Sequence, residues 1–174
     1  MSGSFSRRHL LFLAAGTSLL SVSSPARADA PVMPKGKPIL RIGGQIAEPN
    51  EGDEALFDME TLDALGTKSF STSTPWTDGV STWEGVPLAV LMDAVGATGT
   101  TVRATALNDY VVDLPLQGMV EDGGILAMRR DGKPMPINNK GPLFILYPFD
   151  GSDRLQQQSV YMRCAWQIAR LDIL

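Results

Sequence analysis

The chain has 174 residues, of which 44% are hydrophobic and 20% charged, with 15 basic against 19 acidic side chains. It contains one histidine, His9, and one cysteine, Cys164. Because no histidine follows His9, the rest of the chain cannot form a Ser-His-Asp or Cys-His catalytic site or a histidine-ligated zinc or haem site. A single cysteine excludes an intramolecular disulfide and a four-cysteine iron–sulfur site.

The first residues are typical of a bacterial export signal. Two arginines, Arg7 and Arg8, precede a short apolar run and a stretch of small residues. This run is too short to span a bilayer, and the pattern with its A-x-A sites predicts a signal peptide. The paired arginines favour the twin-arginine route, with an ordinary Sec signal as the alternative. Because Pro31 would hinder cleavage after Ala30, we expect cleavage near Ala28 and a periplasmic protein.

The expected organisation is a signal peptide at residues 1–28, an extended arm at residues 29–38 and a single domain at residues 39–174. Removing the signal leaves 12 basic and 19 acidic residues, a net charge of −7. An acidic surface argues against nucleic acid as a partner, because phosphate contacts need a basic patch. No second apolar segment is long enough to cross a bilayer, so we expect no membrane insertion of the exported chain.

The first half of the domain mixes strand and helix patterns. Asp58 stands where a helix N-cap is expected and Gly66 where that helix should end. A second, clearer helix has Pro87 in its first turn and ends at Gly96. Alternating residues predict strands at residues 39–46 and 68–74, the latter leading into a loop at residues 74–79.

Strands dominate the second half of the domain. β-Branched residues predict strands at residues 101–107 and 110–114, separated by a turn. Three further strands are expected at residues 125–129, 143–147 and 168–173, with a hairpin turn at Asp131-Gly132 after the first of them. The sum is a single α+β domain that is mainly β and has two short helices.

Three polar clusters contain candidate ligand-binding residues: Trp76, Thr77 and Asp78 in the first loop; Asn108, Asp109 and Tyr110 at a strand junction; and Lys140 ahead of the apolar strand. Each cluster also has a purely structural interpretation. The tryptophan can cap the core, the asparagine can form an Asx turn, and the lysine can belong to a polar turn.

Near the C-terminus, Arg163 is a further candidate for ligand binding. Arg163 and Trp166 also suit a structural role, since tryptophan is usually mostly buried. Cys164 has apolar Ala165 beside it and no adjacent charge pair, so we interpret it as a buried, inert thiol.

Taken in order, several segments resemble the molybdopterin-binding domain of sulfite oxidases. The string Trp83-Glu84-Gly85-Val86-Pro87-Leu88, followed by Leu91, resembles its W-x-G-V-P-L-x-x-L segment. The domain also has a series of short motifs, "LA…NG-x-P-L…HG-x-P…P". The segments that resemble them, in the same order, are Ile125-Leu126-Ala127, Asp131-Gly132-Lys133-Pro134-Met135, Lys140-Gly141-Pro142-Leu143 and Pro148. The closing "KW-x-x-x-I" segment is similar to Ala165-Trp166-Gln167-Ile168. The likeness covers residues 39–174 and implies the fold of that domain.

The chain departs from this pattern at two positions. In the enzymes that it resembles, a cysteine just upstream of W-x-G-V-P-L ligates molybdenum, whereas residues 71–76 here read Ser-Thr-Ser-Thr-Pro-Trp. A hydroxyl is a poor substitute for a soft thiolate. Lys140 stands where the motif has its histidine, and basic residues that would grip the cofactor's phosphate are not evident. These departures argue against molybdenum cofactor and redox catalysis.

Cysteine-less, single-domain periplasmic proteins of this fold are pterin-binding regulators. The resemblance implies that a reduced, metal-free pterin binds and that the protein regulates an inner-membrane signalling enzyme, either a cyclic-di-GMP enzyme or a histidine kinase. A pterin needs an aromatic face and hydrogen-bonding partners along its edge. The residues expected to supply them are Trp76 or Tyr110 for stacking, Asp78 or Asp109 with Asn108 for the edge, and Lys140 for a carbonyl or side-chain hydroxyl.

Two alternatives stay open at this point. One is a molybdenum-cofactor-dependent oxidoreductase of the sulfite oxidase superfamily, which the twin-arginine signal supports because that route exports folded, cofactor-loaded proteins. The other is a structural module whose pocket is closed by side chains.

Overall fold

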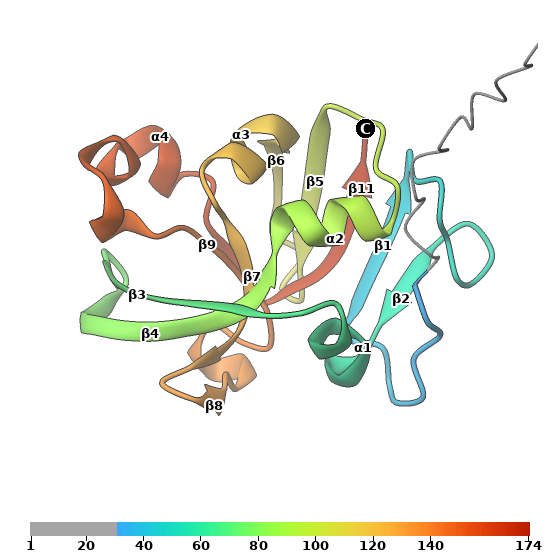
Figure 1. Cartoon of the computed structure of the whole chain (residues 1–174), viewed down its shortest axis with the longest axis horizontal. Helices are drawn as coiled ribbons and strands as arrows, with labels where there is room; N and C mark the ends of the chain where they lie inside the picture. The colour runs from blue at the N-terminus through green and yellow to red at the C-terminus, as the bar shows by residue number, and fades with distance from the viewer. Residues whose placement is uncertain (1–30) are drawn as a thin grey trace, which may run out of the picture.

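Two β-sheets form the body of the protein (Figure 1). The computed structural model describes residues 31–174, so the predicted signal peptide lies outside the described residues. The first sheet has five strands in the order β2-β1-β11-β5-β6. These strands are β1 (Leu40–Gly44), β2 (Ala55–Phe57), β5 (Thr101–Ala106), β6 (Val111–Pro115) and β11 (Ile168–Ile173).

The second sheet follows the order β10-β9-β7-β4-β3, with β8 paired to β7. Its strands are β3 (Lys68–Thr74), β4 (Thr77–Pro87), β7 (Ile125–Arg130), β8 (Lys133–Pro134), β9 (Phe144–Leu146) and β10 (Ala165–Trp166). The chain moves from this sheet back to the first one within the segment from β10 to β11. Trp166 therefore lies at the junction of the two sheets.

The first sheet joins the two ends of the domain. Strand β1 pairs in parallel with the C-terminal strand β11, which in turn pairs antiparallel with β5. Strand β6 pairs with β5 on one side only and forms an edge of the sheet.

Four α-helices and three 3-10 helices lie within residues 31–174. They are α1 (Met59–Ala64), α2 (Leu88–Ala94), α3 (Leu116–Glu121), α4 (Gln158–Tyr161), η1 (Ile137–Asn139), η2 (Phe149–Gly151) and η3 (Asp153–Gln156). Helix α1 begins with a capping box, in which Asp58 accepts from Thr61 N and the Thr61 hydroxyl accepts from the Asp58 N–H. No helix of residues 31–174 is both long and apolar enough to cross a membrane.

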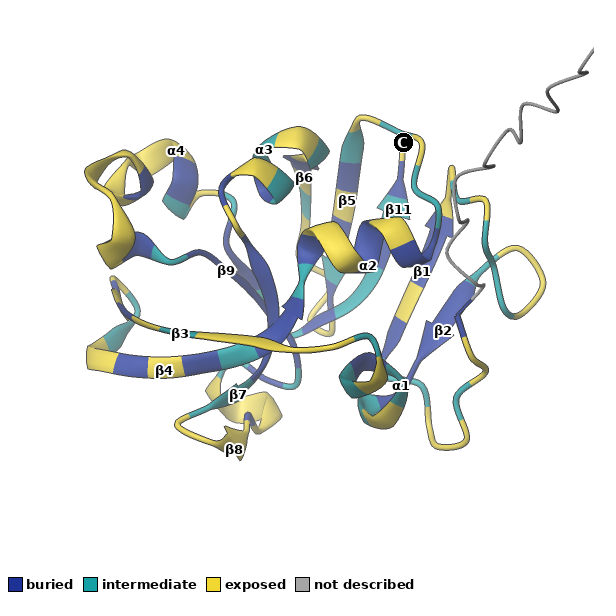
Figure 2. Ribbon diagram, in the orientation of Figure 1, coloured by how far each residue is buried: buried dark blue, intermediate teal, exposed yellow. Residues whose placement is uncertain are grey.

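One hydrophobic core lies between the sheets and helices, which makes this part of the chain a single domain. Figure 2 shows the buried residues concentrated in β7 and β9 and on the inner side of α2. The largest fully buried side chains are those of Trp83, Tyr147, Phe57, Phe144 and Phe149.

Most of the predicted elements are confirmed. The mainly β, α+β class is correct, strand β3 has the predicted bounds, and α1 and α2 start and stop at the predicted caps. The turn at Asp131-Gly132 joins β7 to β8, with positive φ angles of 50° and 75° that suit a hairpin turn.

Three expectations were wrong. The structure has more helices than two, because α3 and α4 are short and each buries a single residue, Met119 or Val160, which leaves no periodic signal. Strands β2, β4 and β10 were not predicted. The expected loop at residues 74–79 is a tight hairpin, in which Thr74 pairs with Thr77 and Asp78 already belongs to β4.

Candidate functional site

A cavity of about 310 Å³ opens between the β5–β6 hairpin and the segment that leads into β10. This volume lies at the lower end of the range for small-molecule pockets. Its lining residues come from these two segments and are Ala106, Asn108, Tyr110, Cys164, Ala165 and Trp166.

The β5–β6 turn supplies one wall of this cavity. Asp109 adopts the left-handed conformation, with φ at 62°, and Asn108 Oδ1 accepts a hydrogen bond from Tyr110 N (3.3 Å). This is the Asx turn that the sequence left as an alternative. The turn holds Tyr110 at the rim, where 56% of its surface is exposed.

The β10 segment supplies the opposite wall and the floor. Strand β10 pairs with β9, so Trp166 lies opposite Phe144 in the sheet. The small side chains of Ala106, Cys164 and Ala165 line the cavity together with the aromatic side chains of Trp166 and Tyr110. Small residues at these three positions leave the cavity open.

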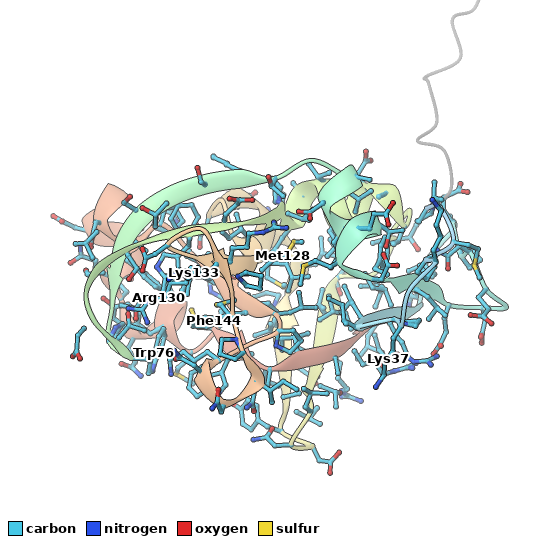
Figure 3. The ribbon with its side chains drawn as sticks, turned by 90° about the horizontal axis from the view of Figure 1, so that it is seen from below. Lys37, Trp76, Met128, Arg130, Lys133 and Phe144 are labelled. Atoms are coloured by element: carbon cyan, nitrogen blue, oxygen red, sulfur yellow. The ribbon has the colours of Figure 1, made fainter. Side chains whose placement is uncertain are left out.

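Trp166 is the point at which the separate clusters meet. The Trp76 ring contacts it edge-on, with 5.8 Å between ring centroids, and Lys140 Nζ lies 4.5 Å from its ring centroid. Trp76 also contacts Phe144, Phe149 and Tyr161, so it supports Trp166 from within an aromatic cluster and does not line the cavity itself. Figure 3 shows Trp76 and Phe144 at the same end of the molecule as Arg130.

Lys140 is held in place by its backbone. It follows η1 in the left-handed conformation, with φ at 65°, and its carbonyl oxygen accepts from Gln167 N (3.3 Å). The ammonium group therefore lies over the face of Trp166, as a cation–π contact requires. This places a positive charge beside the cavity of an acidic protein.

The other predicted residues lie away from the cavity lining. Asp109 is exposed in its turn, and Asp78 is exposed near the tip of the β3–β4 hairpin. Thr77 shares a hydrogen bond of 2.7 Å with the Thr74 hydroxyl and closes that hairpin. Arg163 points toward Asp122, with which it forms an ion pair.

Residues 71–76, where the resemblance in the sequence places the cysteine of the enzymes, are closed by hydrogen bonds to η2. The buried Thr72 hydroxyl accepts from Asp150 N (3.0 Å). Ser73 donates to both carboxylate oxygens of Asp150, through its hydroxyl and its backbone N–H, each at 2.7 Å. These bonds lower the pKa of the Asp150 carboxyl, and they occupy the hydroxyl groups of both Thr72 and Ser73. The donors here do not fit a soft metal.

The one thiol of the chain is also unsuited to bind a metal. Cys164 is buried, and desolvation raises the pKa of its thiol, so the thiolate that a metal needs is disfavoured. Across residues 31–174 no three histidine, cysteine, aspartate or glutamate side chains come together as a metal-binding group. The residues of this domain therefore do not fit a molybdenum ion held by a protein thiolate.

The sequence missed the central role of Trp166 and the contribution of Ala106 and Ala165. Both alanines look like ordinary core residues in a linear sequence, and only the approach of β10 to β5 makes them line a cavity. The Ala165-Trp166 pair in the closing motif was the one available signal. Which of the predicted residues contact a ligand stays a prediction.

Comparison with known proteins identifies the class of this domain. The family model described as the oxidoreductase molybdopterin-binding domain matches residues 58–149, more than half of the chain. The chain therefore belongs to the oxidoreductase molybdopterin-binding domain family, and the family implies a ligand of the pterin type. A comparison with curated protein sequences gives no match.

A solved structure supports the fold. The protein is similar to the sulfane dehydrogenase SoxCD of Paracoccus pantotrophus, with a TM-score of 0.56 and 19% sequence identity. The match covers 77% of this chain and 37% of that chain. The chain thus spans little more than a third of the length of that protein, and at this identity the likeness shows the sulfite-oxidase-type fold alone.

Proposed function

We propose that this protein is a periplasmic pterin-binding protein that holds a reduced pterin without a protein-bound metal. The observation that carries the proposal is a cavity lined by Tyr110 and Trp166 in a domain of the molybdopterin-binding family that lacks a suitable thiolate. The family supplies the ligand class, and the donor chemistry of residues 71–76 argues against the metal.

The chemistry of the cavity suits a flat heteroaromatic ring. Trp166 and Tyr110 offer aromatic surface, and the small floor residues limit the space to one ring system. Asn108 Oδ1 already accepts from Tyr110 N, so its Nδ2 group is the one available to donate to a carbonyl or ring nitrogen of the ligand. Lys140 adds a cation beside the Trp166 face for a carbonyl or hydroxyl.

The finer part of the proposal is a regulatory role. An exported binding domain without histidine or a reactive thiol has few catalytic groups of its own, and the resemblance in the sequence points to regulators of inner-membrane signalling enzymes. We propose that the ligand state of this domain is transmitted to the periplasmic part of such an enzyme, which controls cyclic-di-GMP or a histidine kinase.

Titration with a tetrahydropterin, followed by tryptophan fluorescence, tests ligand binding directly. Trp166 lines the cavity and Trp76 touches it, so binding at micromolar ligand should change the emission. Tyr110→Ala removes one aromatic wall and should weaken binding about tenfold or more. Val80→Ala is the matched control, because Val80 is exposed on β4 and lines no part of the cavity. Tryptophan emission that stays unchanged on addition of the tetrahydropterin would contradict the proposal.

A second function is a molybdenum-cofactor oxidoreductase, which the description of the matching family favours. The thiol beside the cavity is the buried Cys164, so a thiolate-bound metal would depend on it in spite of its burial. Protein from a native periplasm should then contain stoichiometric molybdenum, and Cys164→Ser should lose it. We expect molybdenum to be absent from both proteins.

A further inference from the structure

Strand β6 leaves part of its backbone without hydrogen-bond partners. Ala106 N donates to Tyr110 O (2.9 Å), and bonds across an antiparallel pair fall on every second residue, so Val112 and Leu114 bond to β5. The N–H and C=O groups of Val111 and Asp113 therefore point away from β5. In residues 31–174 no other strand pairs with this edge.

A groove of about 510 Å³ runs along the same edge. One wall is β6 and the other is α4 with the residues that follow it. The lining residues are Val112, Asp113, Leu114, Pro115, Ser159, Met162 and Arg163. The groove thus combines free backbone groups on one side with a side-chain wall on the other.

Exposed apolar side chains lie both in the groove and on the strand beside it. Met162 of the groove wall has 66% of its surface exposed, and Val111 at the start of β6 has 49%. Natural sheet edges are usually protected by charges, bulges or covering segments, because an open edge recruits another strand. Within β6 the protecting residues are Pro115 and Asp113, whose carboxylate is already paired with Arg103 of β5, and α4 stands across the groove without pairing with the strand.

We infer that the β6 edge and this groove bind an extended segment of a partner protein, which adds to the sheet as a sixth strand. The partner's backbone bonds to Val111 and Asp113, as in other cases of strand addition. Its apolar side chains, at alternate positions, fill the groove beside Met162. Since the described domain is acidic overall, the remaining positions of the segment carry lysine or arginine.

A partner segment fits this site better than a second copy of the protein. Two β6 strands paired about their centres would place two Asp113 carboxylates opposite each other, which is unfavourable. A second copy would also have to clear the wall formed by α4 while bringing its own α4 to the interface. A single extended segment meets neither obstacle.

The inference stands independently of pterin binding, although the two sites adjoin. Tyr110 of the cavity precedes Val111 of the edge, and Cys164 of the cavity follows Arg163 of the groove wall. A strand bound to β6 would therefore contact the segments that form the ligand cavity.

A blocked synthetic peptide in which valine alternates with lysine and threonine tests the inference. Amide hydrogen exchange, read by NMR on the protein, should slow about tenfold at Val111 and Asp113 in its presence. The amides of Val112 and Leu114, already bonded to β5, should change little. The same peptide with alternate backbone nitrogens methylated should not protect the edge.

Val111→Pro provides the decisive variant, because it removes an outward donor without removing a bond to β5. It should weaken peptide binding about tenfold, whereas the control Val111→Ala keeps the donor and should bind within about threefold of the original protein. Absence of protection at Val111 and Asp113 at millimolar peptide would overturn the inference. Concentration-dependent dimerisation that Val111→Pro abolishes would overturn it as well.

Discussion

Asp122 explains why Arg163 does not reach the cavity. Its carboxylate is almost fully buried and accepts ion-pair contacts from Arg163 and Arg154, each at 2.5 Å. Desolvation raises the pKa of Asp122, but the hydrogen bonds from the two arginines outweigh it and the net shift is downward. Arg163, whose side chain is 13% exposed and lies over the Tyr147 ring, is thus held by structural contacts.

Replacing this carboxylate should destabilise the fold. Asp122→Asn leaves Arg163 buried without a counter-charge and should lower the free energy of unfolding by about 2 kcal/mol, less than a fully buried pair because Arg154 is exposed. Urea denaturation at neutral pH measures the change. Asp113→Asn, in the exposed pair with Arg103, is the control and should have little effect. Equal losses for the two variants would contradict this account.

Asp58 predicts a specific acid sensitivity. Hydrogen bonds from the Thr61 and Gly36 backbone amides, then from the Thr61 hydroxyl, lower its pKa from 3.8 to about 2. A lowered pKa in the folded state stabilises the protein above the unfolded pKa, and this stabilisation is lost as pH falls from about 4 toward 2. The stability difference between the original protein and Asp58→Asn should therefore shrink over that range. A constant difference across it would refute the assignment.

Local signals explain which single residues could be predicted. Asp58 and Gly66 were identified correctly because caps and helix ends depend on a few neighbouring residues. Trp166 was assigned only a structural role, since its place at the cavity depends on Tyr110 and Lys140, which lie far away in the sequence. Asn108 forms the Asx turn and also lines the cavity, and its contact with a ligand stays a prediction.

At the scale of elements, the W-x-G-V-P-L segment has a clear structural reason for its glycine. This glycine, Gly85, lies at the register shift between β4 and β7. A Cβ atom added to it would lie 2.0 Å from Leu126 O and 2.6 Å from Ala127 Cα. Both neighbours are backbone atoms of the paired strand and cannot move aside without breaking the ladder. The segment therefore sets the close approach of two central strands.

Gly85→Ala should disrupt this pairing. We expect a loss of about 3 kcal/mol in the free energy of unfolding or a failure to fold. Gly151→Ala is a matched control, since a methyl group added there would meet no atom within 4 Å and its backbone needs no positive φ. Thermal unfolding followed by circular dichroism compares the two variants. A Gly85→Ala protein as stable as the control would contradict the close approach of β4 and β7.

Elements with a strong local pattern were predictable, and those formed by tertiary pairing were not. Strands β3 and β11 alternate clearly in the sequence. Strand β4 was not predicted because Asp78-Gly79 is typical of a turn, whereas the actual turn lies at residues 75–76 and Asp78-Gly79 is part of the strand. The short helix α3 buries only Met119 and has no periodicity to detect. The closure of residues 71–76 by Asp150 also could not be foreseen, because it joins residues 77 positions apart.

At the scale of the whole molecule, the aromatic cluster connects the β3–β4 hairpin to the cavity. Trp76 lies at the hairpin turn and contacts Trp166 of β10 and Phe149 of η2. It therefore links the β3–β4 hairpin to the part of the chain that lines the cavity. The sequence offered Trp76 or Tyr110 for stacking; Tyr110 lines the cavity, whereas Trp76 contacts Trp166 from outside the lining.

Trp76→Ala should lower both stability and ligand affinity. The lost packing is expected to cost about 2–4 kcal/mol of unfolding free energy, and Trp166 should lose its support and bind a pterin more weakly. Trp76→Phe keeps an aromatic ring and should retain most of both properties. Calorimetry and the tetrahydropterin titration measure the two effects. Unchanged affinity in a clearly destabilised Trp76→Ala protein would separate Trp76 from the site.

The central claim is that this member of the molybdopterin-binding family holds a pterin and no metal. The measurement that tests it most directly is the joint analysis of metal and released pterin in the protein purified from a native periplasm. We expect a fluorescent pterin in amounts comparable to the protein, and molybdenum at background level. Molybdenum in stoichiometric amounts together with the pterin would contradict it.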